Sequence, residues 1–193
     1  MARQLGFLIN LEKCIGCKAC EMACENARDI SEGSRWRRVV RLRKQFKGVN
    51  SQQLISLACN HCQNPECFRV CPERAYHKRR DGIVLHNPIR CTGCQQCVGA
   101  CPFRTPQYNP LTKKVEKCDL CVSNIDQGQM PSCVEACFFS ALEVVDINNI
   151  PTNASSTTSG FENIKATKPS IAFICSKPVS IYLREHGREG IGD

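Results

Sequence analysis

The sequence predicts a small α+β fold in which two modules of one kind lie in a single chain. Cysteine accounts for 17 of the 193 residues, and sixteen of these fall in four similar sets. The sets recur at intervals of roughly 20–45 residues, which indicates an internal repeat of one supersecondary unit. Short apolar stretches precede several sets, and aromatic residues make up 6% of the sequence. The apolar core is therefore thin, and we expect metal ligation to supply much of the stability, so that the metal-free chain is unfolded.

The clearest set is C-T-G-C-Q-Q-C-V-G-A-C-P, from Cys91 to Pro102. Three cysteines two residues apart, followed by a fourth after three more and a proline, is the spacing with which bacterial ferredoxins bind iron–sulfur clusters. Cys101 lies one helical turn beyond Cys97, so it points away from the first three cysteines and toward another cluster. Pro102 ends this helix because it lacks a backbone N–H. A tetrahedral zinc site needs two pairs of ligands and leaves the third close cysteine unexplained.

The first set follows a short apolar strand, Leu5–Asn10, and keeps the same spacing. Its cysteines are Cys14, Cys17, Cys20 and Cys24. We expect a short helix over Ala19–Arg28 that carries the last two cysteines on one side. Glu25 stands where the proline would follow.

A basic stretch, R-W-R-R-V-V-R-L-R-K-Q-F-K, follows from Arg35 to Lys47. Val39 and Val40 between arginines predict an edge strand. We interpret the stretch as a solvated face near anionic clusters. The alternative is a docking surface for a larger subunit with Trp36 as its anchor, since Trp and Arg are favoured at interface centres.

The second set follows an apolar strand, Leu54–Ala58, and the gap before its third cysteine is longer by two residues. Its cysteines are Cys59, Cys62, Cys67 and Cys71, and Pro72 follows the last one. His61 lies inside the loop; with four cysteines present we expect it to be a hydrogen-bond donor beside the cluster or exposed. The turn Asp81–Gly82 precedes a short strand, I-V-L.

In the fourth set, eleven residues separate the second cysteine from the third. Its cysteines are Cys118, Cys121, Cys133 and Cys137. We expect the insertion Val122–Ser132 to be a loop, because it is polar and ends in Met-Pro, and a strand over Leu142–Val145 to follow. Pro151–Gly160 has the composition of a flexible linker. Ser170–Cys175 is an apolar strand, on which we interpret Cys175 as a buried spare thiol.

The formal charge of +8 would ordinarily suggest a nucleic-acid or membrane partner. Each 4Fe–4S site with four thiolates brings about −2, so four sites offset this charge and nucleic-acid binding is not expected. No apolar run is long enough for a membrane span, and Cys14 comes too early to leave room for a signal peptide. No phosphate-binding loop, dinucleotide fingerprint or nucleophile with a positioned base is present. The remaining chemistry is a relay of single electrons.

In two-cluster ferredoxins the fourth cysteine of each run ligates the other cluster. The second and third sets are adjacent and both end in Cys-Pro, so they are expected to pair, and the first and fourth sets then enclose them. Spacing also allows the first set to pair with the second and the third with the fourth.

The whole pattern resembles the four-cluster iron–sulfur subunit of the molybdopterin oxidoreductases, and dimethyl sulfoxide reductase in particular. The gaps between cysteines are 2-2-3, 2-4-3, 2-2-3 and 2-11-3. Local matches are C-N-H-C-x-x-P-x-C at Cys59–Cys67, H-K-R-x-D-G at His77–Gly82, T-P-Q-Y-N at Thr105–Asn109 and T-K-P at Thr167–Pro169. This resemblance implies the nested pairing in two ferredoxin-like modules. One is discontinuous, 1–50 with 110–150; the other is 51–109; and 151–193 is a linker and tail for subunit contacts.

The nested pairing gives four 4Fe–4S clusters with sixteen cysteine ligands. Cluster A has Cys14, Cys17, Cys20 and Cys137, and cluster B has Cys118, Cys121, Cys133 and Cys24. Cluster C has Cys59, Cys62, Cys67 and Cys101, and cluster D has Cys91, Cys94, Cys97 and Cys71.

The resemblance further implies a non-catalytic electron-transfer subunit that connects a molybdenum or tungsten catalytic subunit with a quinone-reactive membrane anchor. Cluster A is expected to face the catalytic subunit and cluster D the anchor. Relatives with tryptophan at the position of Cys97 hold three irons, so four are expected here. The expected location is the membrane periphery, on the extracytoplasmic side by co-export, with the cytoplasmic face as the alternative. The alternative function is a soluble polyferredoxin that links a formate dehydrogenase to a hydrogenase.

Overall fold

A four-stranded sheet forms the centre of one half of the molecule in the computed structural model, which describes residues 3–28, 30, 33–46, 49–155 and 166–175. The sheet order is β8-β1-β10-β9. Its strands are β1 (Leu5–Asn10), β8 (Leu142–Asp146), β9 (Ala154–Ser155) and β10 (Ile171–Ile174). Strand β1 lies between antiparallel β8 and parallel β10. It is therefore covered on both edges, and its unbroken apolar run is buried.

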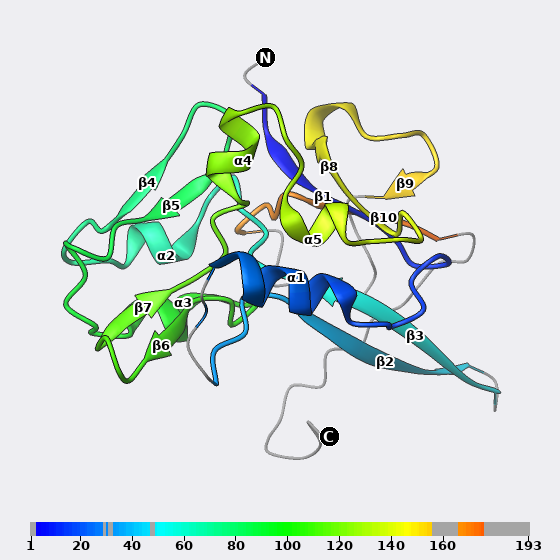
Figure 1. Ribbon diagram of the computed structural model, residues 1–193, viewed down its shortest axis with the longest axis horizontal. Helices are drawn as coiled ribbons and strands as arrows, with labels where there is room; N and C mark the ends of the chain where they lie inside the picture. The colour runs from blue at the N-terminus through cyan, green and yellow to red at the C-terminus, as the bar shows by residue number, and fades with distance from the viewer. Residues whose placement is uncertain (1–2, 29, 31–32, 47–48, 156–165, 176–193) are drawn as a thin grey trace.

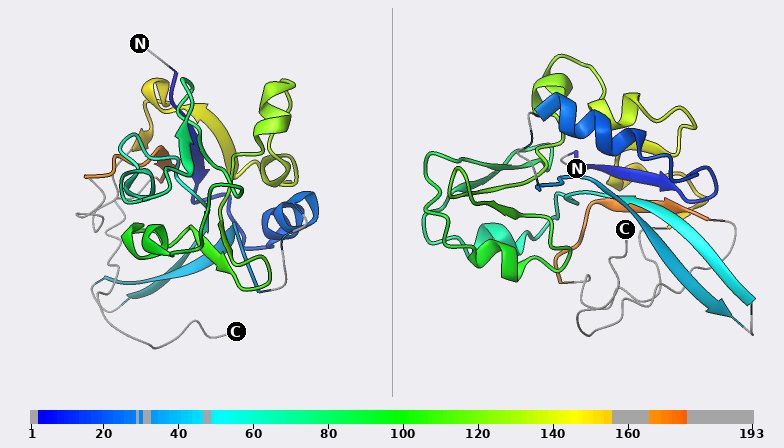
Figure 2. Two further views of the ribbon diagram at one scale, coloured as in Figure 1. Left: turned by 90° about the vertical axis from the view of Figure 1, so that its left-hand side faces the viewer. Right: turned by 60° about the horizontal axis from the view of Figure 1, so that its bottom comes forward.

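Three antiparallel hairpins complete the β structure of the described residues. They are β2 (Arg38–Phe46) with β3 (Val49–Leu57), β4 (Tyr76–Lys78) with β5 (Val84–His86), and β6 (Gln107–Asn109) with β7 (Lys114–Glu116). In Figure 1 the two short hairpins lie on the side away from the sheet, and the long β2–β3 hairpin projects beyond the body of the molecule. Figure 2 shows the same projection from below.

The helices are short, and each follows or carries cysteines. They are α1 (Ala19–Arg28), α2 (Glu66–Arg69), α3 (Gln96–Ala100), α4 (Val122–Asp126) and α5 (Ser132–Glu135). A 3-10 turn, η1 (Ile147–Asn149), follows β8. Helix α1 contacts α5, and α2 contacts α3. The first pair brings together the first and fourth cysteine sets, which are distant in the sequence, and the second pair brings together the adjacent second and third sets.

Several predicted elements are confirmed, and two are wrong. The strand Leu5–Asn10 and the helix Ala19–Arg28 have the predicted bounds. The insertion Val122–Ser132 is not a loop throughout, because α4 occupies its first turn and α5 begins at its last residue. Pro151–Ser155 contains a turn and β9 and is not simply a linker; the rest of the predicted linker lies outside the described residues.

Two apolar clusters form the core. The larger joins the β1 sheet to α1, α5 and the start of the second cysteine set, and the smaller lies between the two short hairpins. Gln4, just before β1, connects the halves: its amide nitrogen donates to the Ser170 hydroxyl at 2.7 Å and to the His61 carbonyl at 3.1 Å. Strand β10 enters the same sheet, so the segment after residue 150 contributes structure here.

Candidate functional site

Cysteines that are far apart in the sequence surround a hollow beside α1. Its lining includes Cys14, Cys17, Cys20 and Cys137. The hollow has a volume of about 410 Å³, including space open to solvent. The first three cysteines come from the loop and start of α1, and the fourth follows α5. Because α1 contacts α5, the fourth cysteine of one set reaches the first three of another.

Two more hollows lie in the other half of the molecule, and each is also lined by four cysteines. One has a volume of about 340 Å³ and is lined by Cys59, Cys62, Cys67 and Cys101. The other has a volume of about 280 Å³ and is lined by Cys71, Cys91, Cys94 and Cys97. The contact between α2 and α3 produces this exchange of the fourth cysteines.

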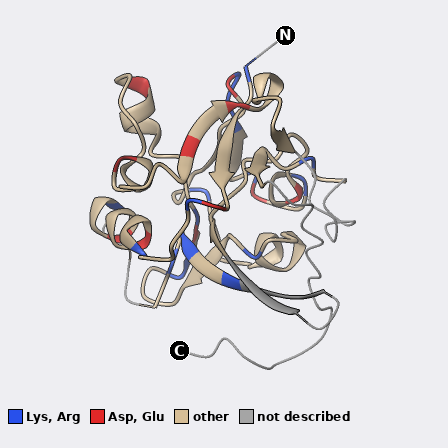
Figure 3. Cartoon of the chain, turned by 90° about the vertical axis from the view of Figure 1, so that its right-hand side faces the viewer, with Lys and Arg blue, Asp and Glu red and all other residues tan. Residues whose placement is uncertain are grey.

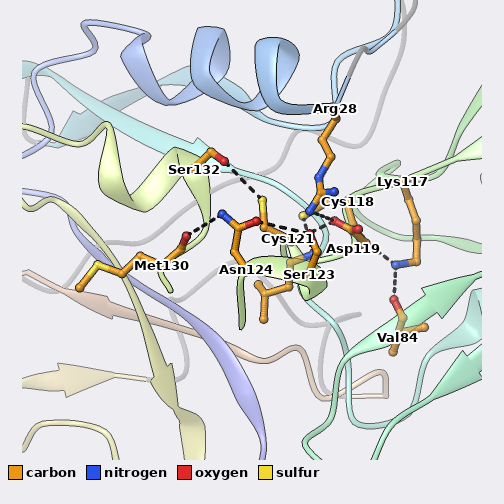
Figure 4. A network of polar contacts seen from close by, with 11 residues as sticks. Arg28, Val84, Lys117, Cys118, Asp119, Cys121, Ser123, Asn124, Met130 and Ser132 are labelled. Carbon is orange, nitrogen blue, oxygen red and sulfur yellow. Dashed lines mark hydrogen bonds and ion pairs between the residues drawn. The ribbon is translucent and has the colours of Figure 1, made fainter. Parts of the chain in front are cut away.

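A fourth group lies between these hollows and consists of Cys24, Cys118, Cys121 and Cys133. Burial raises the pKa of Cys24 to about 12, and the neighbouring Cys133 and Cys121 add to the rise. Figure 4 shows Arg28 and Lys117 near Cys118 and the Ser132 hydroxyl directed at Cys121. The distance between this oxygen and the sulfur is 4.0 Å. Arg28 forms an ion pair with Asp119 at 3.2 Å.

The loops of all four sets share one backbone device. The residue before the second cysteine has positive φ in every set, at Gly16 (75°), His61 (41°), Gly93 (74°) and Leu120 (60°). In two sets this turn directs the N–H of the same residue at the first cysteine: Gly93 to Cys91 Sγ and Leu120 to Cys118 Sγ, both at 3.4 Å. The repeat predicted from the spacing is therefore also a repeat of backbone conformation.

A second N–H···S contact recurs at fourth cysteines. The Ala75 N–H donates to Cys71 Sγ and the Ala141 N–H to Cys137 Sγ, each at 3.3 Å. Hydrogen bonds to cluster sulfurs are among the levers by which a protein sets cluster potential. These contacts stabilise sulfur in its anionic form.

Burial makes several of the cysteine thiols hard to ionise. Burial raises the pKa of Cys62 to about 12, with Cys59 adding to the rise, and burial likewise raises the pKa of Cys118 well above its usual range. All 17 cysteines are free of disulfides. Thiolates are the form that binds metal, so groups of four crowded cysteines without disulfides fit the donor set of an iron–sulfur cluster. Among the described residues, no group of three or more His, Cys, Asp or Glu side chains is placed to hold a single metal ion.

The four groups form a series. Burial raises the pKa of Cys133 against the effect of Arg37, and Cys121 and also Cys20, of the Cys14 group, add to the rise. Burial and then Cys59 of the next group raise the pKa of Cys118. Tyr76 lies between the last two groups, since burial and then Cys97 and Cys67 raise its pKa. The order is therefore the Cys14 group, the Cys24 group, the Cys59 group and the Cys91 group.

Both ends of this series reach the surface. Cys17 in the first group and Cys94 in the last are exposed, whereas the cysteines of the two inner groups are buried or half-buried. Ile15 and Met22, beside the first group, are each 57% exposed. Apolar surface at such a place is typical of a site for another protein.

His61 is buried beside the Cys59 group, with 0% exposure. Its Nδ1 accepts a hydrogen bond from the Val84 N–H at 3.0 Å. Burial lowers the pKa of His61 well below its usual range, and the nearby Lys117 lowers it further. The ring is therefore neutral, and of the two predicted alternatives the exposed one is wrong.

The basic stretch after α1 differs from its predicted structure. The prediction of a solvated face is wrong for Arg37, which is 2% exposed. Trp36 is half-buried and packs against the main core cluster, so it is not a free anchor. The view in Figure 3 shows basic and acidic residues interspersed over several elements.

Sequence reasoning also missed the role of the T-K-P stretch. Thr167 is buried and lines the hollow of the Cys59 group, and its side chain lowers the pKa of Cys62 against the larger effect of burial. The N–H groups of Gln63 and Asn64 donate to the carbonyls of Lys168 and Thr167 at 2.8 and 2.9 Å. This contact spans about a hundred residues, and no local pattern predicts it.

Comparison with known proteins agrees with this geometry. Residues 51–147 match the model of a 4Fe-4S dicluster domain, and residues 5–26 match that of a 4Fe-4S binding domain. The sequence is 38% identical over 158 residues to an anaerobic dimethyl sulfoxide reductase chain of Escherichia coli, covering 78% of this protein and 77% of that one. It belongs to the family of iron–sulfur electron-transfer subunits of molybdopterin oxidoreductases.

Other members of this family are similar over comparable lengths. The thiosulfate reductase electron transfer subunit of Salmonella typhi is 37% identical over 146 residues, covering 74% of this protein and 76% of that one. A tetrathionate reductase subunit of Salmonella typhimurium is 38% identical over 144 residues, covering 74% and 58%. The resemblance predicted from the cysteine pattern is thereby confirmed. In the part of the chain that the structure describes, no helix is long and apolar enough to cross a membrane.

Proposed function

We propose that each of the four cysteine groups holds one 4Fe–4S cluster and that the protein relays single electrons along the series. The ligand sets are Cys14, Cys17, Cys20 and Cys137; Cys24, Cys118, Cys121 and Cys133; Cys59, Cys62, Cys67 and Cys101; and Cys71, Cys91, Cys94 and Cys97. The observation that carries the proposal is that three hollows are each lined by four cysteines of just this grouping. The bound clusters supply one-electron chemistry.

The same grouping supports the nested arrangement of two ferredoxin-like modules. Residues 1–50 with 110–150 form one module, in which α1 contacts α5. Residues 51–109 form the other, in which α2 contacts α3. The segment 151–193 would then contribute β10 to the first module and carry further subunit contacts.

The protein would hold the clusters in position and keep the inner ones away from solvent. Backbone N–H groups donate to cysteine sulfurs, as Gly93 and Leu120 do, and the inner groups are kept from solvent by the core. Electrons would enter and leave at the exposed residues Cys17 and Cys94. We place a molybdopterin catalytic subunit at the Cys14 group and a quinone-reactive membrane anchor at the Cys91 group.

In this arrangement the protein is a non-catalytic subunit held at the membrane by its partners. Relatives are named as parts of dimethyl sulfoxide and thiosulfate reductases, which supports a catalytic partner here. We place the complex on the extracytoplasmic side, exported with that partner. Copurification with a multi-span membrane protein supports this assignment, whereas a hydrogenase without a membrane subunit would favour the soluble polyferredoxin.

A series of serine variants tests the ligand sets. With nested pairing, Cys20→Ser and Cys137→Ser abolish the same EPR signal of the reduced protein, and Cys24→Ser abolishes a different one. With the sequential pairing, Cys137→Ser would remove the signal that Cys94→Ser removes. Cys175→Ser is the control, because Cys175 lies outside the four groups. Cys97→Ser should stall quinol-linked turnover; unaltered turnover would place the anchor elsewhere.

A further inference from the structure

Arg37 is a buried cation without a carboxylate. Its side chain is 2% exposed, and among the described residues no Asp or Glu oxygen lies within ion-pair distance of it. An ionised group in a protein interior must be paired or it is strongly unfavourable. The structure therefore requires a source of negative charge close to Arg37.

One nitrogen of the Arg37 guanidinium has hydrogen-bond partners in the structure. Its Nη1 donates to the Ser56 hydroxyl at 2.9 Å and approaches the Ser56 carbonyl at 3.4 Å. Its Cζ lies 4.3 Å from the centroid of the Phe7 ring, in cation–π geometry. These contacts fix the plane of the guanidinium but leave two of its nitrogens, Nε and Nη2, buried and without a hydrogen-bond partner among the described residues.

Cysteines of two groups surround this cation. Burial lowers the pKa of Arg37, and the thiolate forms of Cys133, Cys118, Cys20 and Cys24 together raise it above its ordinary value. Three of these belong to the Cys24 group and one, Cys20, to the Cys14 group. Arg37 therefore lies between the first two members of the series.

Ser56 connects Arg37 to the first group. Its hydroxyl oxygen lies 3.2 Å from Cys20 Sγ. Since that oxygen accepts a hydrogen bond from Arg37, and a cluster-bound sulfur carries no proton, the Ser56 hydroxyl is the donor to Cys20. Arg37 thus orients the hydroxyl toward the sulfur.

We propose that Arg37 is a positioning residue for electron transfer. Its Nε and Nη2 groups donate to sulfur atoms of the cluster held by the Cys24 group, and its Nη1 orients Ser56 toward Cys20. One cation therefore favours the reduced state of both clusters. The inference rests on the proposed function, because it requires clusters at these two groups. It explains the missing carboxylate, since two adjacent anionic clusters supply the charge. Reduction adds one negative charge to a cluster, and the nearby cation favours that state.

The test is a redox titration, monitored by EPR, of the protein with its clusters bound. The signal that Cys137→Ser removes is assigned to the Cys14 group, and the signal that Cys24→Ser removes is assigned to the Cys24 group. Arg37→Gln should shift the ratio of reduced to oxidised cluster at least tenfold toward oxidised in the Cys24 group, which is 59 mV for a one-electron couple. A smaller shift of the same sign is expected in the Cys14 group and none in the Cys91 group. Arg38→Gln is the matched control: it removes the same charge one residue along, on a less buried side chain, and should change the ratio less than twofold.

Two milder variants decide the matter if Arg37→Gln fails to load. Arg37→Lys keeps the positive charge but loses the several N–H donors of the planar guanidinium group. Ser56→Ala leaves Arg37 in place and removes the hydrogen-bond donor to Cys20. A shift of threefold or more for Arg37→Lys in the Cys24 group, and for Ser56→Ala in the Cys14 group alone, supports the proposal. Loaded variants that titrate like Arg38→Gln overturn it. A wild-type protein without iron would instead refute the proposed function, and this inference with it.

Discussion

Replacing Gly93 by alanine perturbs one cysteine loop at a defined point. Gly93 has φ of 74°, and its N–H donates to Cys91 Sγ at 3.4 Å. A Cβ at this position would lie 2.3 Å from the Lys113 carbonyl oxygen and 3.3 Å from a ring carbon of Tyr108. The backbone of one strand connection therefore occupies the space that the methyl group needs.

Two costs contribute to the expected effect. The left-handed conformation costs a residue with a Cβ about 1–2 kcal/mol, and forcing a methyl group into a packed site costs about 1–3 kcal/mol. Together they give about 2–5 kcal/mol, at the loop of a single cluster. Gly99→Ala is the matched control: Gly99 lies in α3 near Cys97, and a Cβ there meets nothing within 4 Å. Alanine at a compatible glycine position stabilises by about 0.4–1 kcal/mol.

The assay is iron and acid-labile sulfide content together with the temperature at which the brown colour bleaches under anaerobic conditions. Gly93→Ala should lose the cluster of the Cys91 group first, which lowers the iron content by about four atoms per chain. Gly99→Ala should keep its full content and bleach no earlier than wild type. If Gly93→Ala retains all its iron and bleaches together with Gly99→Ala, the loop geometry does not control this site.

Three further predictions concern single side chains. Lys117 is 3% exposed and donates to the Val84 carbonyl and, at 2.8 Å, to the Cys118 carbonyl. Because Lys117→Met removes this buried positive charge, it should lower the reduction potential of the Cys24 or Cys59 cluster in a redox titration. An unchanged potential would contradict this. Thr167→Val should alter the EPR signal of the Cys59 cluster alone, because Thr167 acts on Cys62; changes in all four signals would indicate general loosening instead. Arg79 forms ion pairs with Asp81 at 2.9 Å and with Asp126 at 2.6 Å. Arg79→Ala should lower the free energy of unfolding by about 1 kcal/mol or less, because such partly exposed pairs contribute little. A larger loss in chemical denaturation would show that these ion pairs hold α4 in place.

The elements that the sequence predicted correctly are those with a strong local pattern. Leu5–Asn10 is an unbroken apolar run, and it is the buried central strand β1. Ala19–Arg28 carries two cysteines one helical turn apart, and it is α1. In both cases the pattern depends on neighbours along the chain, so it can be interpreted without tertiary information.

The features that were missed depend on distant partners. Helix α4 has five residues and follows Cys121 in a left-handed conformation; its polar sequence resembles a loop. The Asn124 amide donates to the Met130 carbonyl at 3.2 Å, and Arg79 contacts Asp126, and these contacts fix the segment. Arg37 appears in the sequence as one of many cations, and it is buried among cysteines that the first and fourth sets bring together.

The most direct test of the account is the metal content of the protein as purified without air. Four 4Fe–4S clusters predict about sixteen irons and sixteen acid-labile sulfides per chain, falling by about four of each in Cys137→Ser and staying at the wild-type level in Cys175→Ser. A folded wild-type protein that contains a few zinc ions and no sulfide would contradict the account.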